Sequence, residues 1–461
     1  MEAMKPHVLA ALACALPLLL SAPAGADGLS GKGTFIAFTD PHFDPLRDPS
    51  VLGALEAAEP KDWEAILERS GVSDFGAYGR DAPWPLVKSA LDAMAAADPK
   101  PDFVLFLGDL VAHHLRESYF AYDARPTETR YAAFLGKTAA FMAMELGRRF
   151  PGAPILPVLG NNDADCGDYS PEPDGPALAA YAAAWKPLVG PQAETFAATF
   201  RQGGYYSIAH PTVPKRRIVV LDDTFLSEHY RACGDGTADP GRRQLDWLKG
   251  ELDSAAARGE KVWLLLHIPV GIDVWATLRR GACLLPPQPM LEAKYAPRLL
   301  RILRDGASAL QSLWSGHIHM DDGRLLPGAP PVLDKVVPGV SPIFGNNPAF
   351  QVYAYDPGDG AIRDYRTWIL PGLDAGKPPV WRVEYTFSQA YGLTRVDGAA
   401  MAALAGRLPG DADTRRLYQT YYASSDVARS AITPGNWRAY WCGIGNVTPP
   451  AFQACYCGGP R

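Results

Sequence analysis

The sequence has little that would place the mature chain in a membrane or on a nucleic acid. Beyond residue 26, no stretch approaches the roughly 20 apolar residues that a membrane-spanning helix needs. Basic residues are outnumbered, with 44 Lys and Arg against 50 Asp and Glu, and they are scattered along the chain. With a net charge of −6, the chain lacks the basic footprint of a protein that binds nucleic acid polymers. Internal repeats and low-complexity tracts are also absent.

The N-terminal segment has the features of a secretory signal. Lys5 and His7 precede an apolar run over Val8–Leu20, and the small residues at 24–26 form a cleavage site. The apolar run is too short to span a bilayer. We therefore expect residues 1–26 to be removed and the mature chain to be secreted or periplasmic. The rest of the chain is long enough for a large domain and a smaller one, at roughly 150 residues per domain.

Cysteine is scarce, and no two cysteines have the Cys-x-x-Cys spacing that is typical of thiolate metal sites. Apart from Cys14 in the signal segment, the cysteines are Cys166, Cys233, Cys283, Cys442, Cys455 and Cys457. An even number in an exported chain suggests disulfides, for which fifteen pairings exist. Cys455 and Cys457 are too close in sequence to pair without strain, so each needs another partner. Cys166 and Cys233 lie in long loops beside the motifs described next, and we expect them to pair.

Five apolar, strand-like runs each end in residues that commonly bind metals. The runs are Thr34–Thr39, Phe103–Leu107, Pro154–Leu159, Lys261–Leu266 and Ala309–Trp314. They lead, in order, into Asp40 with His42, Asp109, Asn161 with Asp163, His267, and His317 with His319. Ligands of open α/β sheets gather outside the carboxyl ends of the strands. Alternate residues of an extended segment also point to the same side. The pattern therefore predicts a converging site for two divalent metals.

Between these runs lie stretches with the apolar spacing of helices, at 86–94, 131–142, 244–257 and 291–303. This alternation predicts α/β layers. After His319, three further strands are expected at 331–337, 350–355 and 362–369, joined by turns, and we expect them to form a second, more antiparallel sheet. Pro and Gly residues near 371–379 suggest a boundary. We expect one domain over 27–372 and a mainly helical C-terminal domain over 373–461.

As an ordered set, these motifs resemble those of the calcineurin-like metallophosphoesterases. Asp109 followed by His113 at four residues, the stretches 339–355 and 383–393, and the cysteine-containing tail resemble the acid sphingomyelinase-like phosphodiesterase branch. The resemblance covers residues 33–457. It implies a four-layer sandwich, with two mixed β-sheets flanked by helices, and a small, mainly helical, disulfide-clamped C-terminal domain. It also implies a disulfide between Cys442 and Cys455, which leaves Cys283 and Cys457 to pair by elimination.

The resemblance further implies a ligand set. One metal would take Asp40, His42 and His319, the other would take Asn161, His267 and His317, and Asp109 would bridge the two. Two divalent ions with two carboxylates leave a charge of +2, which can attract a phosphate anion. Imidazole and carboxylate ligands suit zinc, which we expect here, or iron or manganese. A hydroxide bridging ions roughly 3.5–4 Å apart would attack phosphorus.

One position departs from the family pattern. The residue after the ligand asparagine is usually histidine, and here it is Asn162. An amide can donate a hydrogen bond to a phosphate oxygen, but it cannot deliver a proton to a leaving group. The task of general acid is therefore expected to fall to His113. The alternative is that His113, next to His114, is an ordinary surface residue.

The expected function is that of an exported two-metal phosphoric ester hydrolase, an acid sphingomyelinase-like phosphodiesterase. Its substrate would be a small phosphate ester or a phospholipid headgroup. We expect the protein to be a monomer that makes transient contact with a membrane surface. A phosphomonoesterase or nucleotide hydrolase on the same site is the alternative. A metal-binding protein without turnover is a remote alternative. An enzyme that has lost its activity in evolution would usually have lost a metal ligand, and here every expected ligand is present.

Overall fold

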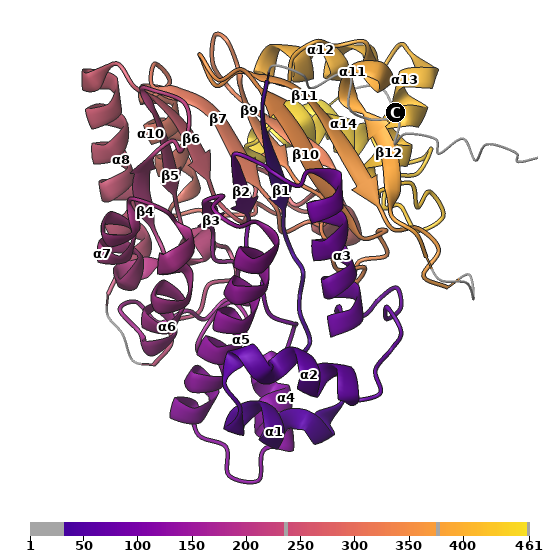
Figure 1. Cartoon of the computed structure of the whole chain (residues 1–461). Helices are drawn as coiled ribbons and strands as arrows, with labels where there is room; N and C mark the ends of the chain where they lie inside the picture. Colours follow the sequence, from indigo (N-terminus) through magenta and orange to yellow (C-terminus); the bar gives the residue numbers. More distant parts are fainter. Residues whose placement is uncertain (1–31, 235–237, 375–378, 459–461) are drawn as a thin grey trace, which may run out of the picture.

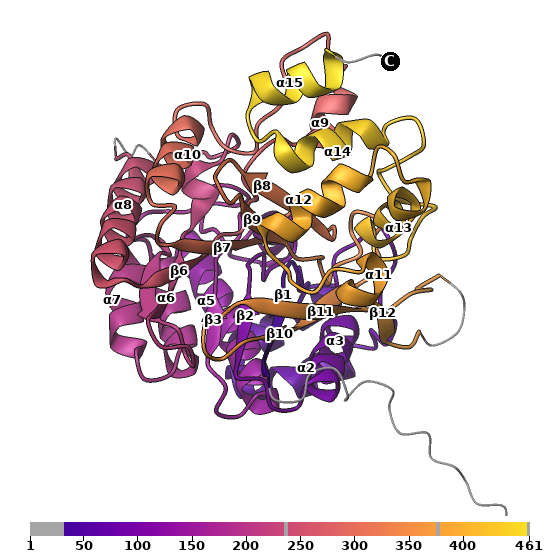
Figure 2. The ribbon, with the colours of Figure 1, turned by 90° about the horizontal axis from the view of Figure 1, so that it is seen from above.

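The computed structural model describes residues 32–234, 238–374 and 379–458, so the expected signal segment 1–26 lies outside the described residues. In this part of the chain two mixed six-stranded sheets pack face to face. The first has the order β12-β11-β10-β1-β2-β3 and the second the order β4-β5-β6-β7-β9-β8. Figure 2 shows four layers, which are C-terminal helices, the second sheet, the first sheet and N-terminal helices. The expected sandwich of two mixed sheets flanked by helices is confirmed.

The strands are short, and many are buried. In the first sheet they are β1 (Gly33–Phe38), β2 (Phe103–Phe106), β3 (Ile155–Pro157), β10 (Ala349–Tyr355), β11 (Ile362–Ile369) and β12 (Arg382–Thr386). In the second sheet they are β4 (Tyr206–Ala209), β5 (Arg216–Val220), β6 (Lys261–Leu265), β7 (Leu310–Ser315), β8 (Asp322–Leu326) and β9 (Val332–Val336). The strands β1, β2 and β3 run parallel, as do β5, β6, β7 and β9, so their carboxyl ends point the same way within each sheet.

Helices cover the outer faces and edges of both sheets (Figure 1). On the N-terminal side they are α1 (Leu52–Ala57), α2 (Trp63–Arg69), α3 (Trp84–Ala97), α4 (Leu115–Tyr122), α5 (Glu128–Arg149), α6 (Pro176–Trp185) and α7 (Ala193–Gly203). Later in the chain come α8 (Pro240–Arg258), α9 (Val274–Arg279), α10 (Ala296–Asp305), α11 (Phe387–Tyr391), α12 (Gly398–Arg407), α13 (Ala412–Tyr422), α14 (Trp437–Gly445) and α15 (Pro449–Cys457). The helices α12 and α14 pack against β8 and α12 also packs against β9, so the C-terminal helices cover the second sheet.

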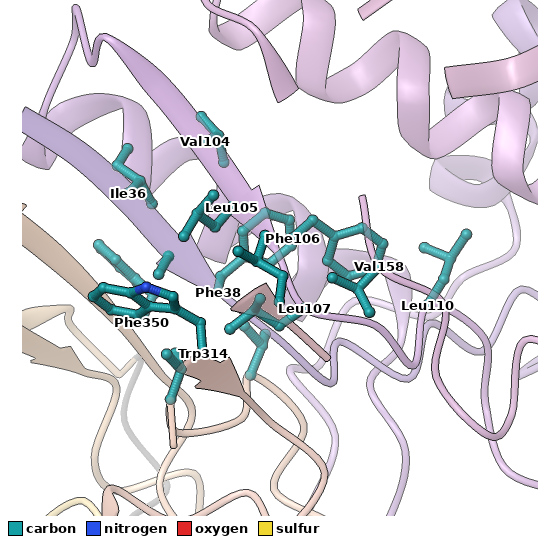
Figure 3. Close-up of a cluster of buried hydrophobic side chains, with 14 of the residues drawn as sticks. Ile36, Phe38, Val104, Leu105, Phe106, Leu107, Leu110, Val158, Trp314 and Phe350 are labelled. Carbon is teal, nitrogen blue, oxygen red and sulfur yellow. The ribbon is translucent and has the colours of Figure 1, made fainter. Parts of the chain in front are cut away.

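Aromatic side chains fill the space between the two sheets. Phe35 of β1 stacks on Tyr353 of β10, with ring centroids 4.8 Å apart, and meets Trp263 and Trp314 of the opposite sheet at 5.5 Å each. Trp314 also meets the ring of Tyr353 edge-on at 5.0 Å, and Figure 3 draws it together with other side chains of this buried core. Such pairs stabilise the fold by more than the burial of their apolar area alone would. This core fixes the two sheets relative to each other and so positions the strand ends that carry the site.

The strands after His319 are placed differently from the expectation of a separate, more antiparallel sheet, which is wrong. β9 joins the second sheet beside β7, whereas β10, β11 and β12 extend the first sheet antiparallel to β1. Every residue of β10 is buried, and the strand pairs with β1 on one side and with β11 on the other. It pairs with the side of β1 that β2 leaves open. Apolar alternation predicts a strand but does not say which open edge the strand completes.

The expected boundary at residue 372 falls within the first sheet. β12 lies beyond it and pairs with β11, through partners such as Thr367 and Tyr385. The helices α11 to α15 then follow without a further strand among the described residues. The division into 27–372 and 373–461 stays a prediction, and the sheet continues across it.

Three disulfides lie within the described residues, and their pairs are those expected. Cys166 joins Cys233, Cys283 joins Cys457 and Cys442 joins Cys455, with Cα–Cα distances of 5.8, 5.6 and 5.9 Å. The last two bonds tie α15 to α14 and to the loop after α9. No helix in the described ranges has the length and apolar character to cross a membrane.

A buried histidine away from the strand-end site leads to a prediction about stability. His210 follows β4 and is 5% exposed. Its Nδ1 accepts hydrogen bonds from the backbone N–H groups of Val213 and Thr212, at 3.1 and 3.3 Å. The ring meets those of Phe103 and Trp263 edge-on at 4.9 Å each. Burial, with a smaller contribution from the nearby Arg216, lowers the pKa of His210 to about 3.

Because an unfolded histidine titrates near 6.5, the unfolded chain takes up a proton between about pH 6.5 and 3 that the folded chain does not. His210 should therefore lower the free energy of unfolding as the pH falls through this window, by up to about 1.4 kcal/mol per pH unit. His210→Asn keeps an acceptor for the turn and removes the titration. Chemical denaturation at several pH values should show a flatter profile for this variant than for wild type or His114→Asn, an exposed control. Parallel profiles for all three proteins would refute the prediction.

Candidate metal centre and active site

Seven side chains with metal-binding groups follow the carboxyl ends of five strands and meet at one place between the two sheets. They are Asp40 and His42 after β1, Asp109 after β2, Asn161 after β3, His267 after β6, and His317 and His319 after β7. Backbone hydrogen bonds fasten these loops together: the N–H of Asp40 donates to Gly108 O and that of Gly316 donates to His267 O, both at 2.9 Å. The structure therefore brings together the whole set that the strand ends predict.

Five of these residues have left-handed backbone conformations, a feature that the sequence did not reveal. The φ angles are 51° for Asp40, 40° for His42, 54° for Asp109, 67° for His317 and 60° for His319. A non-glycine residue held there costs on the order of 1–3 kcal/mol, and such residues cluster at active sites and ligand clamps. The surrounding hydrogen bonds must offset this cost. The strain marks these loops as built for positioning side chains rather than for stability.

The first group consists of Asp40, His42 and His319, all completely buried. The Nε2 atoms of the two histidines are 3.1 Å apart. Oδ1 of Asp40 lies 3.4 Å from Nε2 of His319 and 3.7 Å from Nε2 of His42. Within the described residues this oxygen has no hydrogen-bond partner. Three donor atoms thus converge on one point, as ligands of a metal ion do.

The second group consists of Asp109, His267 and His317, with Asn161 beside them. Nε2 of His267 lies 3.3 Å from Oδ2 of Asp109 and 3.2 Å from Oδ1 of Asn161. The same Oδ2 of Asp109 lies 3.4 Å from Nε2 of His42 in the first group. One carboxylate oxygen is therefore shared between the two groups, which is the placement of a bridging ligand.

The orientation of the histidine rings fits metal binding. For three of them, Nδ1 lies within hydrogen-bonding distance of a backbone carbonyl oxygen: Val111 O for His42 (3.2 Å), Leu107 O for His267 (2.8 Å) and Ser341 O for His319 (3.0 Å). A carbonyl oxygen can only accept, so each Nδ1 carries the proton. In the neutral ring that binds a metal, the lone pair is then on Nε2 and points to the centre, which is the usual arrangement of histidine ligands.

His317 is oriented the other way round. Its Nε2 lies 3.4 Å from the hydroxyl of Tyr169. Its Nδ1 is buried and makes no hydrogen bond to any described residue. Nδ1 is therefore the nitrogen available to a metal in this ring.

The two asparagines after β3 have different partners. Asn161 donates from Nδ2 to Asp168 at 2.6 Å, which turns its Oδ1 toward His267. Asn162 donates from its backbone N–H and from Nδ2 to the two carboxylate oxygens of Asp109, at 2.8 and 2.9 Å. The amide of Asn162 thus holds the shared carboxylate in place. Its expected hydrogen bond to a phosphate oxygen stays a prediction.

The buried carboxylates of the centre are negatively charged and need cations nearby. Burial by itself would raise the pKa of Asp40, but His319 and His42 lower it to about 2. Burial acts in the same sense on Asp109, yet His267 and His42 hold its pKa well below the usual range. Both carboxylates are therefore ionised although Asp40 is 0% and Asp109 2% exposed. Buried charges of this kind are paired or bind metals, so the donor set fits divalent ions.

Two further aspartates support the loops. Asp163 accepts hydrogen bonds from the backbone N–H groups of Gly160 and Leu110, each at 2.9 Å. Asp223, after β5, accepts from the N–H groups of His267 and Ile268, at 3.0 and 3.1 Å. Asp163 was part of a recognised motif, but Asp223 was missed. The signal was present, because Asp223 also follows an apolar strand-like run.

His113 lies at the edge of the centre and is held by Asp81. Its Nδ1 and its backbone N–H both face the carboxylate of Asp81, at 3.0 Å each, and its ring stacks on that of His42 at 4.2 Å. Nδ1 therefore donates, and Nε2 remains for exchange with a substrate. His113, Asp81, Asp109 and His317 line a cleft of about 650 Å³. The neighbouring His114 is 75% exposed.

A sandwich of two mixed sheets with two ligand groups around a shared aspartate is the arrangement of a metal-dependent phosphoester hydrolase. Residues 33–321 match the calcineurin-like phosphoesterase family, and the chain belongs to that family.

Known proteins in one branch of this family resemble the whole chain. The cyclic GMP-AMP phosphodiesterase SMPDL3A of Mus musculus is 28% identical over 96% of this chain and 97% of its own. The acid sphingomyelinase-like phosphodiesterase 3b of Homo sapiens is 27% identical over 87% and 84%. The sphingomyelin phosphodiesterase of Homo sapiens is 27% identical over 77% of this chain and 53% of its own. Among solved structures, a dimetal phosphatase from Danio rerio aligns at 15% identity over 73% of this chain and 95% of its own, with a TM-score of 0.42. The three phosphodiesterases place the chain in the acid sphingomyelinase-like branch.

Proposed function

We propose that the chain is a phosphodiesterase that works with two divalent ions, most suitably zinc. Asp40, His42 and His319 would hold one ion, and Asn161, His267 and His317 would hold the other. Asp109 would serve both. The observation that carries this proposal is the position of Asp109 Oδ2, which lies 3.4 Å from a histidine of one group and 3.3 Å from a histidine of the other.

The bound ions would supply an activated water nucleophile and positive charge for the phosphate oxygens. The chain supplies the positioning. Backbone carbonyl oxygens fix three histidine rings, Asn162 holds Asp109, and Asp168 turns the amide of Asn161. His113 is placed to give a proton to the leaving oxygen from Nε2, because its Nδ1 is engaged by Asp81.

The charge of the cleft favours a diester over a monoester. Its wall carries the guanidinium groups of Arg47 and Arg80 together with the carboxylates of Asp44, Asp81 and Asp168. This wall therefore adds no net positive charge to that of the two ions. A phosphate diester has one negative charge at neutral pH, whereas a monoester has up to two and needs more compensation. The names of the relatives also describe phosphodiesterases.

Two substrates with the same leaving group test this proposal. Bis-(p-nitrophenyl) phosphate and p-nitrophenyl phosphate both release p-nitrophenolate, so a difference in rate reports the charge and the second substituent. The diester should have the higher kcat/KM. A higher kcat/KM for the monoester would favour the phosphomonoesterase or nucleotide hydrolase. Turnover of neither substrate by protein with both ions bound would favour a metal-binding protein without activity.

We also propose that the protein is exported. Three disulfides are typical of proteins in oxidising compartments, and they fit the expected removal of residues 1–26. The mass of protein recovered from the periplasm or the medium should correspond to a chain that begins at residue 27. The uncleaved mass in the cytosol would contradict export.

A further inference from the structure

The hydroxyl of Tyr169 lies at the edge of the metal centre, next to His317. Its oxygen is 3.4 Å from Nε2 of that histidine. The two rings stand nearly perpendicular, at 86°, with their centroids 6.2 Å apart. Tyr169 also lines the catalytic cleft of about 650 Å³, together with Asp109 and His113. One side chain therefore borders both a metal-binding ring and the space that a substrate would occupy.

The nitrogen that His317 offers to a metal decides which way this hydrogen bond runs. Nδ1 of His317 is buried, makes no hydrogen bond to a described residue and is the nitrogen available to an ion. A neutral imidazole with its lone pair on Nδ1 carries its proton on Nε2. Nε2 then donates, and the oxygen of Tyr169 accepts. The hydroxyl hydrogen of Tyr169 stays unused, because no other described residue lies where it could accept that hydrogen.

The backbone holds Tyr169 in a fixed position. Its φ angle is 58°, in the left-handed region that bulky side chains rarely adopt. Its N–H donates to Asn161 O at 2.9 Å, and its carbonyl oxygen accepts from the N–H of Arg231 at 3.0 Å. The disulfide between Cys166 and Cys233 joins the same two loops. The hydroxyl is therefore in place before a ligand arrives, and a hydrogen bond to the ligand costs little ordering.

We propose that Tyr169 is a catalytic residue that donates a hydrogen bond to a non-bridging oxygen of the phosphate diester. The inference rests on the proposed phosphodiesterase function and adds a residue to its site. Negative charge is spread over the equatorial oxygens in the transition state, and a fixed donor stabilises that charge. Tyr169 keeps its hydrogen throughout. Its role thus differs from that of His113, which gives a proton to the leaving oxygen.

Tyr169→Phe removes the hydroxyl and keeps the ring. With both ions confirmed by elemental analysis, kcat for bis-(p-nitrophenyl) phosphate should fall by roughly 10²–10³-fold, the usual effect of losing one preorganised donor. Unactivated alkyl diesters should slow by the same factor, because the proton of the leaving group does not come from Tyr169. A loss confined to the alkyl diesters would overturn the inference. Turnover of no diester by the wild-type protein would instead contradict the proposed function.

Binding of inorganic phosphate to the metal-loaded protein gives a readout without turnover. Calorimetry should show a Kd about tenfold higher for Tyr169→Phe than for wild type, which is the size expected for a hydrogen bond to a charged group. Tyr230→Phe is the matched control, because Tyr230 precedes Arg231 on the neighbouring loop and does not line the cleft. It should keep the wild-type Kd.

The alternative role of Tyr169 is to orient His317 alone. In that case Tyr169→Phe would bind its ions more weakly, and excess metal would restore both the wild-type rate and the wild-type Kd for phosphate. This result would overturn the proposed contact with the phosphate oxygen, as would equal values of Kd in Tyr169→Phe and Tyr230→Phe.

Discussion

Replacing Asp109 with asparagine is expected to lower kcat/KM by at least about 10³-fold. Residues that only orient a metal ligand typically change metal affinity or activity 10–100-fold, and a ligand shared by two ions should exceed that. Asn keeps the shape of the side chain and an oxygen that can accept from the N–H of Asn162. The fold should therefore persist while the charge shared by the two groups is lost.

Steady-state kinetics and metal analysis of Asp109→Asn should be compared with Asp168→Asn. Asp168 lies behind Asn161 and orients its amide, so this control should lose roughly 10–100-fold. The Asp109 variant should also retain less metal. A smaller loss of activity in Asp109→Asn than in Asp168→Asn would contradict the bridging role.

His113→Gln is expected to slow the hydrolysis of unactivated alkyl diesters by roughly 10²–10⁴-fold, the usual contribution of a general acid. An alkoxide leaving group needs a proton, whereas nitrophenolate departs without one. The nitrophenyl diester should therefore slow far less, and the metal content should stay the same. His114→Gln is the matched control, because His114 is adjacent and 75% exposed.

Equal losses on both kinds of substrate, with metal still bound, would show that His113 only positions the phosphate. Asp81→Asn gives a second readout of the same role. It removes the carboxylate that faces Nδ1 of His113 and should affect the alkyl diester more than the nitrophenyl diester.

Much of the centre could be predicted because it depends on local patterns. Each apolar run of five or six residues ends within two residues of the end of its strand, and parallel strands bring those ends to one edge. Residues as far apart as Asp40 and His319 could therefore be grouped without knowledge of their contacts. The alternation of strand and helix patterns also predicted α/β layers, whereas the four-layer sandwich was implied by the resemblance to the metallophosphoesterases.

The rest depends on contacts that no local pattern carries. Asp81 is held against His113 across 32 residues, through the packing of two loops. The left-handed backbone at Asp40 and Asp109 is imposed by contacts with neighbouring segments of the same chain, against the local preference of an aspartate. The membership of β10 in the first sheet was decided by which side of β1 remained open. Such features arise only when the sheets pack.

The metal content of active protein tests the account most directly. Elemental analysis of the purified mature chain, with activity measured on the same sample, should give close to two divalent ions per chain. Removal of the ions by a chelator should abolish activity, and their return should restore it. Full activity in protein that holds one ion or none would contradict the account.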